Sequence, residues 1–345
     1  MRYDLSPMEQ SGIPSAPKVS VIIPNYNHSL YLERRFQSIV CQTYSDFELL
    51  ILDDASKDNS LEIIRDFARH YPARIIENKT NSGSPFRQWN RGVGEARGEY
   101  IWIAESDDEA DSRFLERMVE VLDSNPNVVL AYCRSTRIDE EGQICKSPVP
   151  NWESRSWETD FINPGVKECA DHLIWINTIP NASGVLFRKA AYLKAGGAEE
   201  GMRFAGDWIT WCRILLQGDV AYTAEELNRF RLHGNSVRTT TASSLCSEEY
   251  YRVRVLLSQC IEVSPALSGE LARTANEAAF WYLKSRDWPK VKELLWAALR
   301  HKVQLESFKL VFICFQVFLL TRFPSAYMVA KNILLFPAKC IRKAD

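Results

Sequence analysis

An apolar run that leads straight into three acidic residues constrains the fold of this chain more than any other feature. Residues 100–104 read Tyr-Ile-Trp-Ile-Ala, and Glu105, Asp107 and Asp108 follow them. Near-continuous runs of β-branched and aromatic residues are typical of strands in parallel sheets that are buried on both faces. The run therefore predicts such a strand, with three carboxylates at its carboxyl end, where open α/β sheets bind their ligands.

The acidic cluster itself has two interpretations. Glu105, Asp107 and Asp108 lie close enough in sequence to repel one another, and such clusters persist where a cation or a polyphosphate–metal complex neutralises them. Alternatively, the residues form a solvated loop that caps the next helix, because Asp and Ser are good N-caps. The pattern of strands and helices in the rest of the chain distinguishes a ligand site from a helix cap.

Strands and helices alternate through the first part of the chain. Amphipathic stretches with apolar residues at helical spacing separate the apolar runs, as in 86–96 and 114–122. This alternation is typical of a doubly wound α/β fold, in which helices cover both faces of a mostly parallel sheet. The strands are predicted at residues 19–24, 47–52, 73–77, 100–104 and 128–132.

The second part of the chain is predicted to complete the sheet and then to become helical. Residues 139–170 are polar and broken by prolines, which indicates an excursion over the surface. Two later helical stretches, 271–284 and 289–301, resemble a single tetratricopeptide-type hairpin. The remaining predicted elements are a strand at 183–188, a helix at 207–217, a closing element at 221–230 and helices from about residue 245.

Composition and charge exclude several classes of protein. The 345 residues are 46% hydrophobic and carry a formal net charge of −2, which argues against nucleic acid as the main partner. The nine cysteines form no C-x-x-C pair and have no zinc spacing with histidine, so reduced thiols in a cytoplasmic setting are expected. The N-terminus lacks the apolar core of a signal peptide, and no window holds the roughly 18 apolar residues of a membrane span.

The last segment of the chain combines aromatic, aliphatic and basic residues. Residues 308–320 are largely apolar but too short for a span, and five basic residues follow among apolar ones. This mix suits a helix lying in the headgroup region of an anionic membrane, which predicts peripheral contact with the inner face of the cell membrane. The alternative is a helix packed on the body of the protein or in a dimer interface.

The ends of the first, second and fourth strands are expected to meet in one crevice, because neighbouring strand ends of a doubly wound sheet lie together. The residue after the first strand is not part of a G-x-G-x-x-G loop, which argues against NAD, and a Walker lysine loop is also absent. The pattern suits a nucleoside diphosphate bound with Mg²⁺ or Mn²⁺. The side chains expected to share this pocket are those of Tyr26, Asp53, Asp54, Glu105, Asp107 and Asp108.

Several motifs in order resemble the family 2 glycosyltransferases of GT-A fold. They are the strand–Pro–Asn–Tyr–Asn turn within 19–58, the Asp-Asp-Ala-Ser-Lys-Asp motif at 53–58, the stretch 81–92 and the acidic cluster. The resemblance covers residues 18–240 and implies a nucleotide-sugar donor, a divalent metal and inversion at the anomeric carbon. It divides the chain into a tail (1–17), a glycosyltransferase domain with a nucleotide-binding half (18–133) and an acceptor half (134–240), and a helical region (245–345).

The resemblance also implies roles for individual residues of the nucleotide-binding half. Tyr26 would lie against the base, Asp54 would hydrogen-bond it, and Asp53 would support the same end of the site. The family's metal-binding D-x-D motif falls on Glu105-Ser106-Asp107, with glutamate in place of the first aspartate, so Asp107 and Asp108 are the expected cation ligands. The plain alternative for Asp53 and Asp54 is an Asx turn before a helix. The full set of expected donor-site residues is Pro24, Tyr26, Asp53, Asp54, Asn90, Glu105, Asp107, His233 and Arg238.

In the acceptor half, the resemblance points to Asp207 as the catalytic base. Gly206-Asp207 occupies the place of the family's acidic pair, with glycine where an acid is usual. Asp207 would take the proton of the attacking hydroxyl, although it would also serve as a helix N-cap. Trp208 beside it is a candidate for stacking on the acceptor, against the alternative of a core tryptophan. His233 in the Arg-x-His segment would approach the metal or diphosphate, and Arg238 the phosphates.

The sequence thus predicts an inverting glycosyltransferase that moves a sugar from a UDP- or dTDP-sugar to a hydroxyl of a glycan or lipid-linked glycan. Two other functions stay open. Nucleotidyl transfer to a sugar phosphate uses a similar sheet, but its usual glycine-rich basic loop is missing. A non-catalytic nucleotide-sugar-binding scaffold is the second, because Glu105 and Gly206 depart from the family's pattern.

Overall fold

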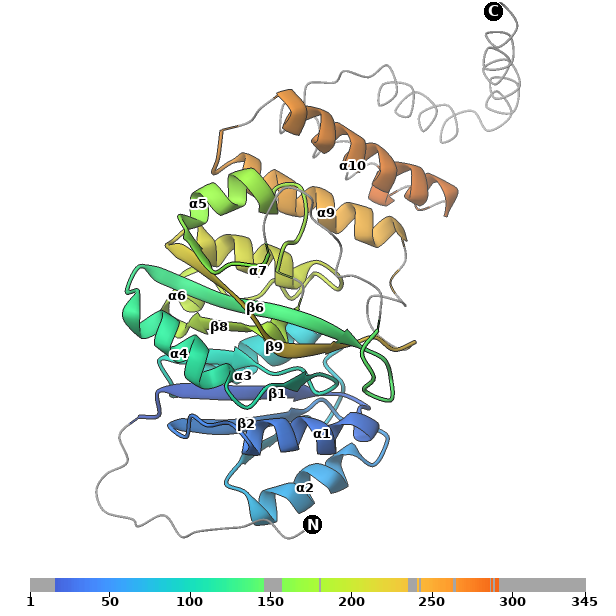
Figure 1. Ribbon diagram of the computed structural model, residues 1–345. Helices are drawn as coiled ribbons and strands as arrows, with labels where there is room; N and C mark the ends of the chain where they lie inside the picture. The colour runs from blue at the N-terminus through green and yellow to red at the C-terminus, as the bar shows by residue number, and fades with distance from the viewer. Residues whose placement is uncertain are drawn as a thin grey trace, which may run out of the picture. The chain divides into compact units, whose positions relative to one another are not determined.

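The computed structural model describes residues 16–145, 157–179, 181–234, 241, 243–262, 265–285, 287 and 289–291. Within them, nine strands form one mixed sheet in the order β3-β2-β1-β4-β8-β6-β9-β5, with β7 paired to β9 beside this path. Figure 1 shows β1 and β2 side by side in this sheet, with β6 further along it. The predicted α/β sheet is therefore present.

The first four strands of the chain make the parallel half of the sheet. Strands β1 (Val19–Asn25), β2 (Phe47–Asp53), β3 (Arg74–Glu77) and β4 (Tyr100–Ile103) all run in the same direction. They end together, so that Asn25 pairs with Asp53 at the carboxyl edge. The polar residues that follow each strand consequently emerge at one edge of the sheet.

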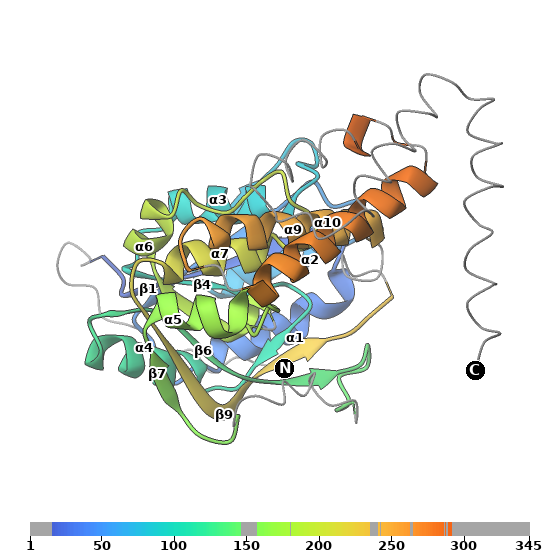
Figure 2. The ribbon, with the colours of Figure 1, turned by 90° about the horizontal axis from the view of Figure 1, so that it is seen from above.

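Helices cover both faces of this parallel half. Alternate residues of the strands, such as Val21 and Trp102, pack in one apolar cluster with α1 (Ser29–Val40), α2 (Ser60–His70) and α4 (Phe114–Ser124). The opposite face carries α3 (Pro85–Glu95), whose Gly92 approaches Ile22 so closely that an added Cβ would lie 2.6 Å from that side chain. Figure 2 shows α3 and α4 on opposite sides of β1 and β4.

The second half of the sheet departs from parallel order. Strand β8 (Val185–Arg188) runs antiparallel between β4 and β6 (Val128–Ile138), and β9 (Asp219–Arg231) runs parallel to β6. The short β5 (Glu109–Ala110) follows the acidic cluster and pairs antiparallel with the end of β9. The other elements of this part are β7 (Phe161–Asn163), α5 (Gly165–Glu168), a π-helix (Cys169–Leu173), a 3₁₀ turn (Ala182–Gly184), α6 (Lys189–Lys194) and α7 (Gly206–Leu215).

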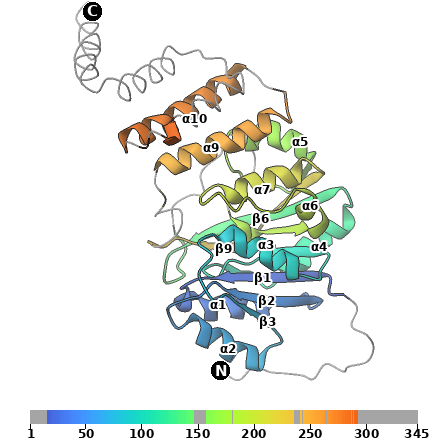
Figure 3. The ribbon, with the colours of Figure 1, turned by 180° about the vertical axis from the view of Figure 1, so that it is seen from behind.

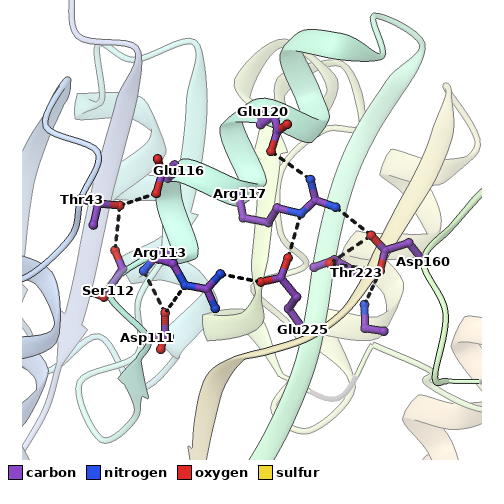
Figure 4. A network of polar contacts seen from close by, with 11 residues as sticks. Thr43, Asp111, Ser112, Arg113, Glu116, Arg117, Glu120, Asp160, Thr223 and Glu225 are labelled. Carbon is purple, nitrogen blue, oxygen red and sulfur yellow. Dashed lines mark hydrogen bonds and ion pairs between the residues drawn. The ribbon is translucent and has the colours of Figure 1, made fainter.

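A network of charged side chains ties α4 to β9 and to the residues before β7 (Figure 4). Arg113 bonds Glu225 at 2.8 Å, and Arg117 contacts both Glu225 at 3.1 Å and Asp160 at 2.8 Å. Asp160 in turn accepts the backbone N–H of Ala224 at 2.8 Å. The pairs are partly exposed, so each contributes little alone, and the shared partners make them act as a group.

Two compact units divide the described chain. One contains the sheet, and the other contains 166–178, 201–212 and the residues from 234 onward. In the second unit, α9 (Ser243–Ser258) and α10 (Pro265–Lys284) lie side by side (Figure 3). Among the described residues, none of the helices combines the length and apolar character that crossing a membrane requires. The predicted N-terminal tail, most of 289–301 and the basic-aromatic segment after residue 308 lie outside the described residues.

Candidate active site

The loops that leave β1 and β2 are joined by polar contacts. Asn25 donates its side-chain amide to Asp53 Oδ1 at 2.9 Å and to Ser56 Oγ at 3.1 Å. Asn27, which has a positive φ of 57°, accepts the backbone N–H of Lys57 at 2.7 Å. Asp53 also accepts the N–H and O–H of Ser56, so the Asx turn expected as its plain alternative is present. The two strand ends therefore form one shared rim.

Tyr26 stands on this rim with 38% of its surface exposed. Pro24, near the end of β1, pairs with Leu52 and lies beyond Ile22, the last residue of β1 that pairs with β4. A proline fits there because its missing N–H is not needed by the sheet on that side. The side chain of Tyr26 is thus accessible to solvent, and its predicted stacking on a base stays a prediction.

Asp54 is buried and accepts four hydrogen bonds from the segment that leads into α3. Its Oδ1 accepts from Asn78, from the backbone of Ser82 at 2.8 Å and from Gln88 at 3.0 Å, and its Oδ2 accepts the Ser82 hydroxyl at 2.7 Å. Asp54 thereby shapes the loop between β3 and α3. Its predicted contact with a base stays a prediction, and Ala55 beside it adopts a positive φ of 59°, which is strained for alanine.

Helix α3 reaches the acidic residues of two different strand ends. Gln88 donates to Asp54 after β2, and the adjacent Trp89 donates its indole N–H to Glu105 Oε1 at 2.8 Å after β4. Because consecutive residues of one helix bind both carboxylates, the acids from separate strands approach the same end of α3. That Tyr26, Asp53, Asp107 and Asp108 share a pocket with these two acids stays a prediction.

Asn90, the next residue of α3, binds α6 and the segment that follows it. Its Oδ1 accepts from Tyr192 at 2.7 Å and from the backbone of Ala198 at 2.8 Å, and its amide donates to Ala198 and to Glu200. The side chain of Asn90 thus makes four hydrogen bonds to three residues. Its role in donor binding stays a prediction.

Two buried arginines bind the loop that carries Glu105, Asp107 and Asp108, here called the acidic loop. Arg35 on α1 donates to the carbonyl of Glu105 at 2.8 Å and to Ser183 Oγ at 3.2 Å, while Ser183 accepts the N–H of Glu105 at 3.0 Å. Arg231 at the end of β9 donates to the carbonyl of Asp107 at 2.7 Å. Both side chains are about fully buried, so their charges compensate those of the acids.

The pairing of β5 with β9 brings histidine to the acidic loop. Glu109 lies opposite Arg229, so the residues just before Glu109 face those just after Arg229. Arg231 donates its N–H to Asp108 Oδ1 at 2.8 Å, and His233 Nε2 lies 2.9 Å from Asp107 Oδ2. Asp107 and His233 were both predicted site residues from distant parts of the chain, and the structure joins them.

A second histidine, which the sequence did not single out, completes a cluster. One ligand atom each from His28, Asp107 and His233 lies within 4.8 Å of the others. Asp108 is not part of this cluster, because its carboxylate is buried and accepts from Arg231. A carboxylate oxygen and two imidazole nitrogens at this spacing fit a divalent cation by the chemistry of the donor set.

The pKa values of the three acids shift in different directions. Burial, together with the charge of Asp107, raises the pKa of Glu105 to about 8 and also raises the pKa of Asp108. Burial acts in the same direction on Asp107, but the hydrogen bond with His233 and the charge of His28 lower its pKa below the usual value. The charge of the cluster is therefore concentrated on Asp107, the acid that faces the histidines.

The predicted base and acceptor residues lie in the second unit. Asp207 is half-buried in the first turn of α7, accepts the N–H of Trp208 at 2.7 Å and accepts from Asn177 at 3.2 Å. Trp208 is 2% exposed and donates its indole N–H to the carbonyl of Leu173 at 2.9 Å. The structure thus gives Trp208 a packing role, and its predicted contact with an acceptor stays a prediction.

A carboxylate from α9 holds the segment before α7. Glu249 is fully buried and accepts the backbone N–H groups of Arg203, Phe204 and Ala205 at 2.7, 2.8 and 2.7 Å. The sequence analysis did not single out Glu249, His28, Arg35 or Trp89 as site residues, because the contact partner of each lies far away in the chain. Arg238, the last predicted site residue, lies outside the described residues.

The chain is similar to known proteins over part of its length. Residues 20–178 match the model of the family described as Glycosyl transferase family 2. The chain is 27% identical over 238 residues to an uncharacterized glycosyltransferase of Nostoc sp., covering 67% of this chain and 70% of that protein. It is 24% identical over 255 residues to the uncharacterized glycosyltransferase YibD of Escherichia coli, covering 72% and 71%.

Solved structures share the fold. The crystal structure of S. aureus TarS 1–349 in complex with UDP-GlcNAc has a TM-score of 0.62 at 18% identity, covering 82% of this chain and 81% of that one. The mannosyltransferase PcManGT from Pyrobaculum calidifontis, solved with GDP-Man and Mn²⁺, has a TM-score of 0.54 at 17% identity, covering 94% and 88%. The sheet and its helices are thus GT-A-like. Residues 20–178 therefore form a Glycosyl transferase family 2 domain, in a chain that is similar to glycosyltransferases over about two thirds of its length.

Proposed function

We propose that this protein transfers a sugar from a UDP- or dTDP-sugar to a hydroxyl of a glycan or lipid-linked glycan, with inversion at the anomeric carbon. The observation that carries the proposal is the meeting of acids from two strand ends on α3, with the Asp107–His233 pair at the acidic loop. Transfer of a nucleotide to a sugar phosphate is disfavoured, because the family match is to sugar transfer.

The donor would bind along the rim of the parallel strands. The exposed ring of Tyr26 offers a stacking surface for the base, and Pro24, Asp53 and Asp54 hold the rim on which it stands. Glu105 would contact the ribose side of the donor, and Asn90 would shape the donor site through the segment it holds. Arg238 is proposed to contact the phosphates.

The diphosphate would lie at the acidic loop. Asp107, with Asp108 behind it and His233 beside it, is the proposed seat of a divalent cation, Mg²⁺ or Mn²⁺. Bound there, the cation would offset negative charge on the leaving diphosphate. Arg35 and Arg231 keep the loop in place by binding its backbone carbonyls.

Asp207 is the proposed general base. Its carboxylate takes the proton of the acceptor hydroxyl as that oxygen attacks the anomeric carbon. The new carbon–oxygen bond forms on the face opposite the diphosphate, and the nucleoside diphosphate leaves with the electron pair of the old bond. Trp208 next to the base is proposed to border the acceptor site, and the basic-aromatic C-terminal segment is proposed to keep the enzyme near a lipid-linked acceptor at the membrane.

The experiment that tests this function is transfer by an Asp207→Asn variant. Release of UDP or dTDP from a panel of nucleotide sugars, with Mn²⁺ present, identifies the donor for the wild type. Asp207→Asn is expected to lower kcat by roughly 10²–10⁴-fold, because a positioned base contributes that much, while donor-induced thermal shifts stay unchanged. NMR of the product should show the inverted anomer.

Asp171→Asn is the matched control, because Asp171 is an exposed acid of the same unit whose partner is Lys167. Its kcat should equal that of the wild type. Full activity of Asp207→Asn would exclude Asp207 as the base, and absence of transfer from every donor in the wild type would favour the binding scaffold. A truncated 1–300 form with full activity on membranes would contradict the proposed role of the C-terminal segment.

A further inference from the structure

Polar contacts position both histidines of the cluster, since His233 contacts Asp107 and His28 contacts Ser106. His28 Nδ1 lies 2.8 Å from Ser106 Oγ, so its other ring nitrogen is the one left for a ligand. The rings of His28 and His233 meet edge to face with centroids 5.5 Å apart. Imidazoles that bind metals are typically held in this way through their second nitrogen.

Tyr31 and Arg231 also hold the cluster of His28, Asp107 and His233 in place. Tyr31 packs against both imidazoles, with ring centroids 5.9 Å from His28 and 5.3 Å from His233. The guanidinium of Arg231 lies 5.1 Å from the Tyr31 ring and also binds the carbonyl of Asp107. His233 is nearly buried, with 3% of its side chain exposed, and Asp107 exposes 16%. Three potential ligands are therefore held in place by side chains from α1, the acidic loop and β9.

We propose that His28 is a third protein ligand of the cation, so that the site selects Mn²⁺ or a similar first-row transition cation over Mg²⁺. This inference rests on the proposed function, which places a divalent cation at Asp107. It goes further by assigning the ligand set His28, Asp107 and His233, and by deriving the metal preference from it.

The chemical reason lies in the donor atoms. Mg²⁺ prefers oxygen ligands in a strict octahedron and usually keeps several waters, whereas imidazole nitrogen suits transition cations. Two nitrogens and one carboxylate leave positions open for diphosphate oxygens and water. A loop that offered only the carboxylates of Glu105, Asp107 and Asp108 would lack this preference, and Asp108 is turned away toward Arg231.

Metal binding itself provides the test, separate from sugar transfer. The full-length protein is stripped with chelator and titrated with Mn²⁺, with and without UDP, while electron paramagnetic resonance reports free Mn²⁺. Mg²⁺ is then added as competitor. The wild type should retain Mn²⁺ against at least about a tenfold excess of Mg²⁺. His28→Ala should weaken Mn²⁺ binding by at least about tenfold, as loss of a metal contact does.

Two further variants sharpen the result. His28→Asp replaces nitrogen by oxygen at the same place and should shift the preference toward Mg²⁺. His70→Ala is the matched control, because His70 is an exposed histidine on α2 that contacts only the backbone of its own helix at Asp66, and it should bind Mn²⁺ as the wild type does. Thermal unfolding of each variant identifies any loss of folding, and His28→Asp keeps the test informative if His28→Ala unfolds.

The outcomes separate the inference from the proposed function. Equal affinity of the wild type for Mn²⁺ and Mg²⁺ would overturn the inference, as would Mn²⁺ binding that is lost in Asp107→Asn and unchanged in His28→Ala and His28→Asp. In both cases a cation still binds at Asp107, and the proposed function stands. Failure of the wild type to bind either cation with UDP present would overturn both the inference and the cation of the proposed function.

Discussion

Arg35 is fully buried, although a guanidinium group is normally kept in water. Burial lowers the pKa of Arg35, while the charges of the nearby carboxylates favour its ionised form. Its guanidinium donates to the carbonyl of Glu105 and to the hydroxyl of Ser183. The same serine accepts the N–H of Glu105, so the peptide groups on both sides of that residue are held. We infer that Arg35 fixes the acidic loop before any donor binds.

Replacing Arg35 should therefore be costly. Arg35→Met keeps the length of the side chain but leaves buried acids without their counter-charge, and we expect a loss of about 3–5 kcal/mol in the free energy of unfolding. Arg34→Met on the same helix, whose side chain is half-exposed, should lose about 0–1 kcal/mol. Urea denaturation followed by fluorescence measures both. Equal losses in the two variants would show that burial of Arg35 carries no special role.

At the scale of elements, α9 supports the start of α7. The carboxylate of Glu249 accepts three successive backbone N–H groups, those of Arg203, Phe204 and Ala205, in the loop that leads into α7. Arg254 on the same helix binds the carbonyls of Ile174 and Trp175 at 3.0 and 2.7 Å. The C-terminal helices thus act as a brace for the segment that carries the proposed base.

Loss of this brace should affect the chemical step. Glu249→Gln offers one acceptor oxygen in place of two, so Asp207 should shift, and kcat should fall by roughly 10²-fold with little change in KM for the donor. Glu248→Gln is the control, because Glu248 is a buried neighbour that binds Tyr282 and Lys290 instead of α7. Steady-state kinetics that show equal kcat losses in both variants would contradict a specific role for Glu249.

At the scale of the whole molecule, the rate at which buried cysteine thiols are modified measures how often the folded structure opens. All seven cysteines in the described part of the chain are free, and Cys133, Cys169 and Cys212 are buried while Cys41 and Cys260 are exposed. Burial raises the pKa of the Cys133 and Cys212 thiols, which lowers the fraction of reactive thiolate. Thiol reactivity should therefore differ sharply among sites of one residue type.

We expect iodoacetamide under native conditions to modify Cys41 and Cys260 within minutes, and Cys133, Cys169 and Cys212 only at the rate of unfolding. Mass spectrometry of peptides after timed labelling measures each site. The three buried thiols should become reactive together with loss of the folded signal in urea. Rapid native labelling of Cys133 would show that the sheet opens far more often than its packing suggests.

The strands and acids of the parallel half could be predicted because their signals are local. Apolar runs such as those within β1 and β4 predict buried strands without reference to the rest of the chain. The carboxyl ends of parallel strands then lie at a common edge of the sheet. The sequence alone therefore determined the α/β class, the edge of the sheet that carries the site, and the presence there of Tyr26, Asp54 and Asp107.

Only the tertiary structure decided which side chains complete the site. The contact between Arg35 and Glu105 spans 70 residues, and that between Asp107 and His233 spans 126, so neither leaves a trace in local spacing. His28 becomes a candidate ligand because β5 pairs with β9 and carries His233 to it. Strand formation follows from neighbouring residues, whereas a cation site depends on where distant strand ends and helices are brought together by packing.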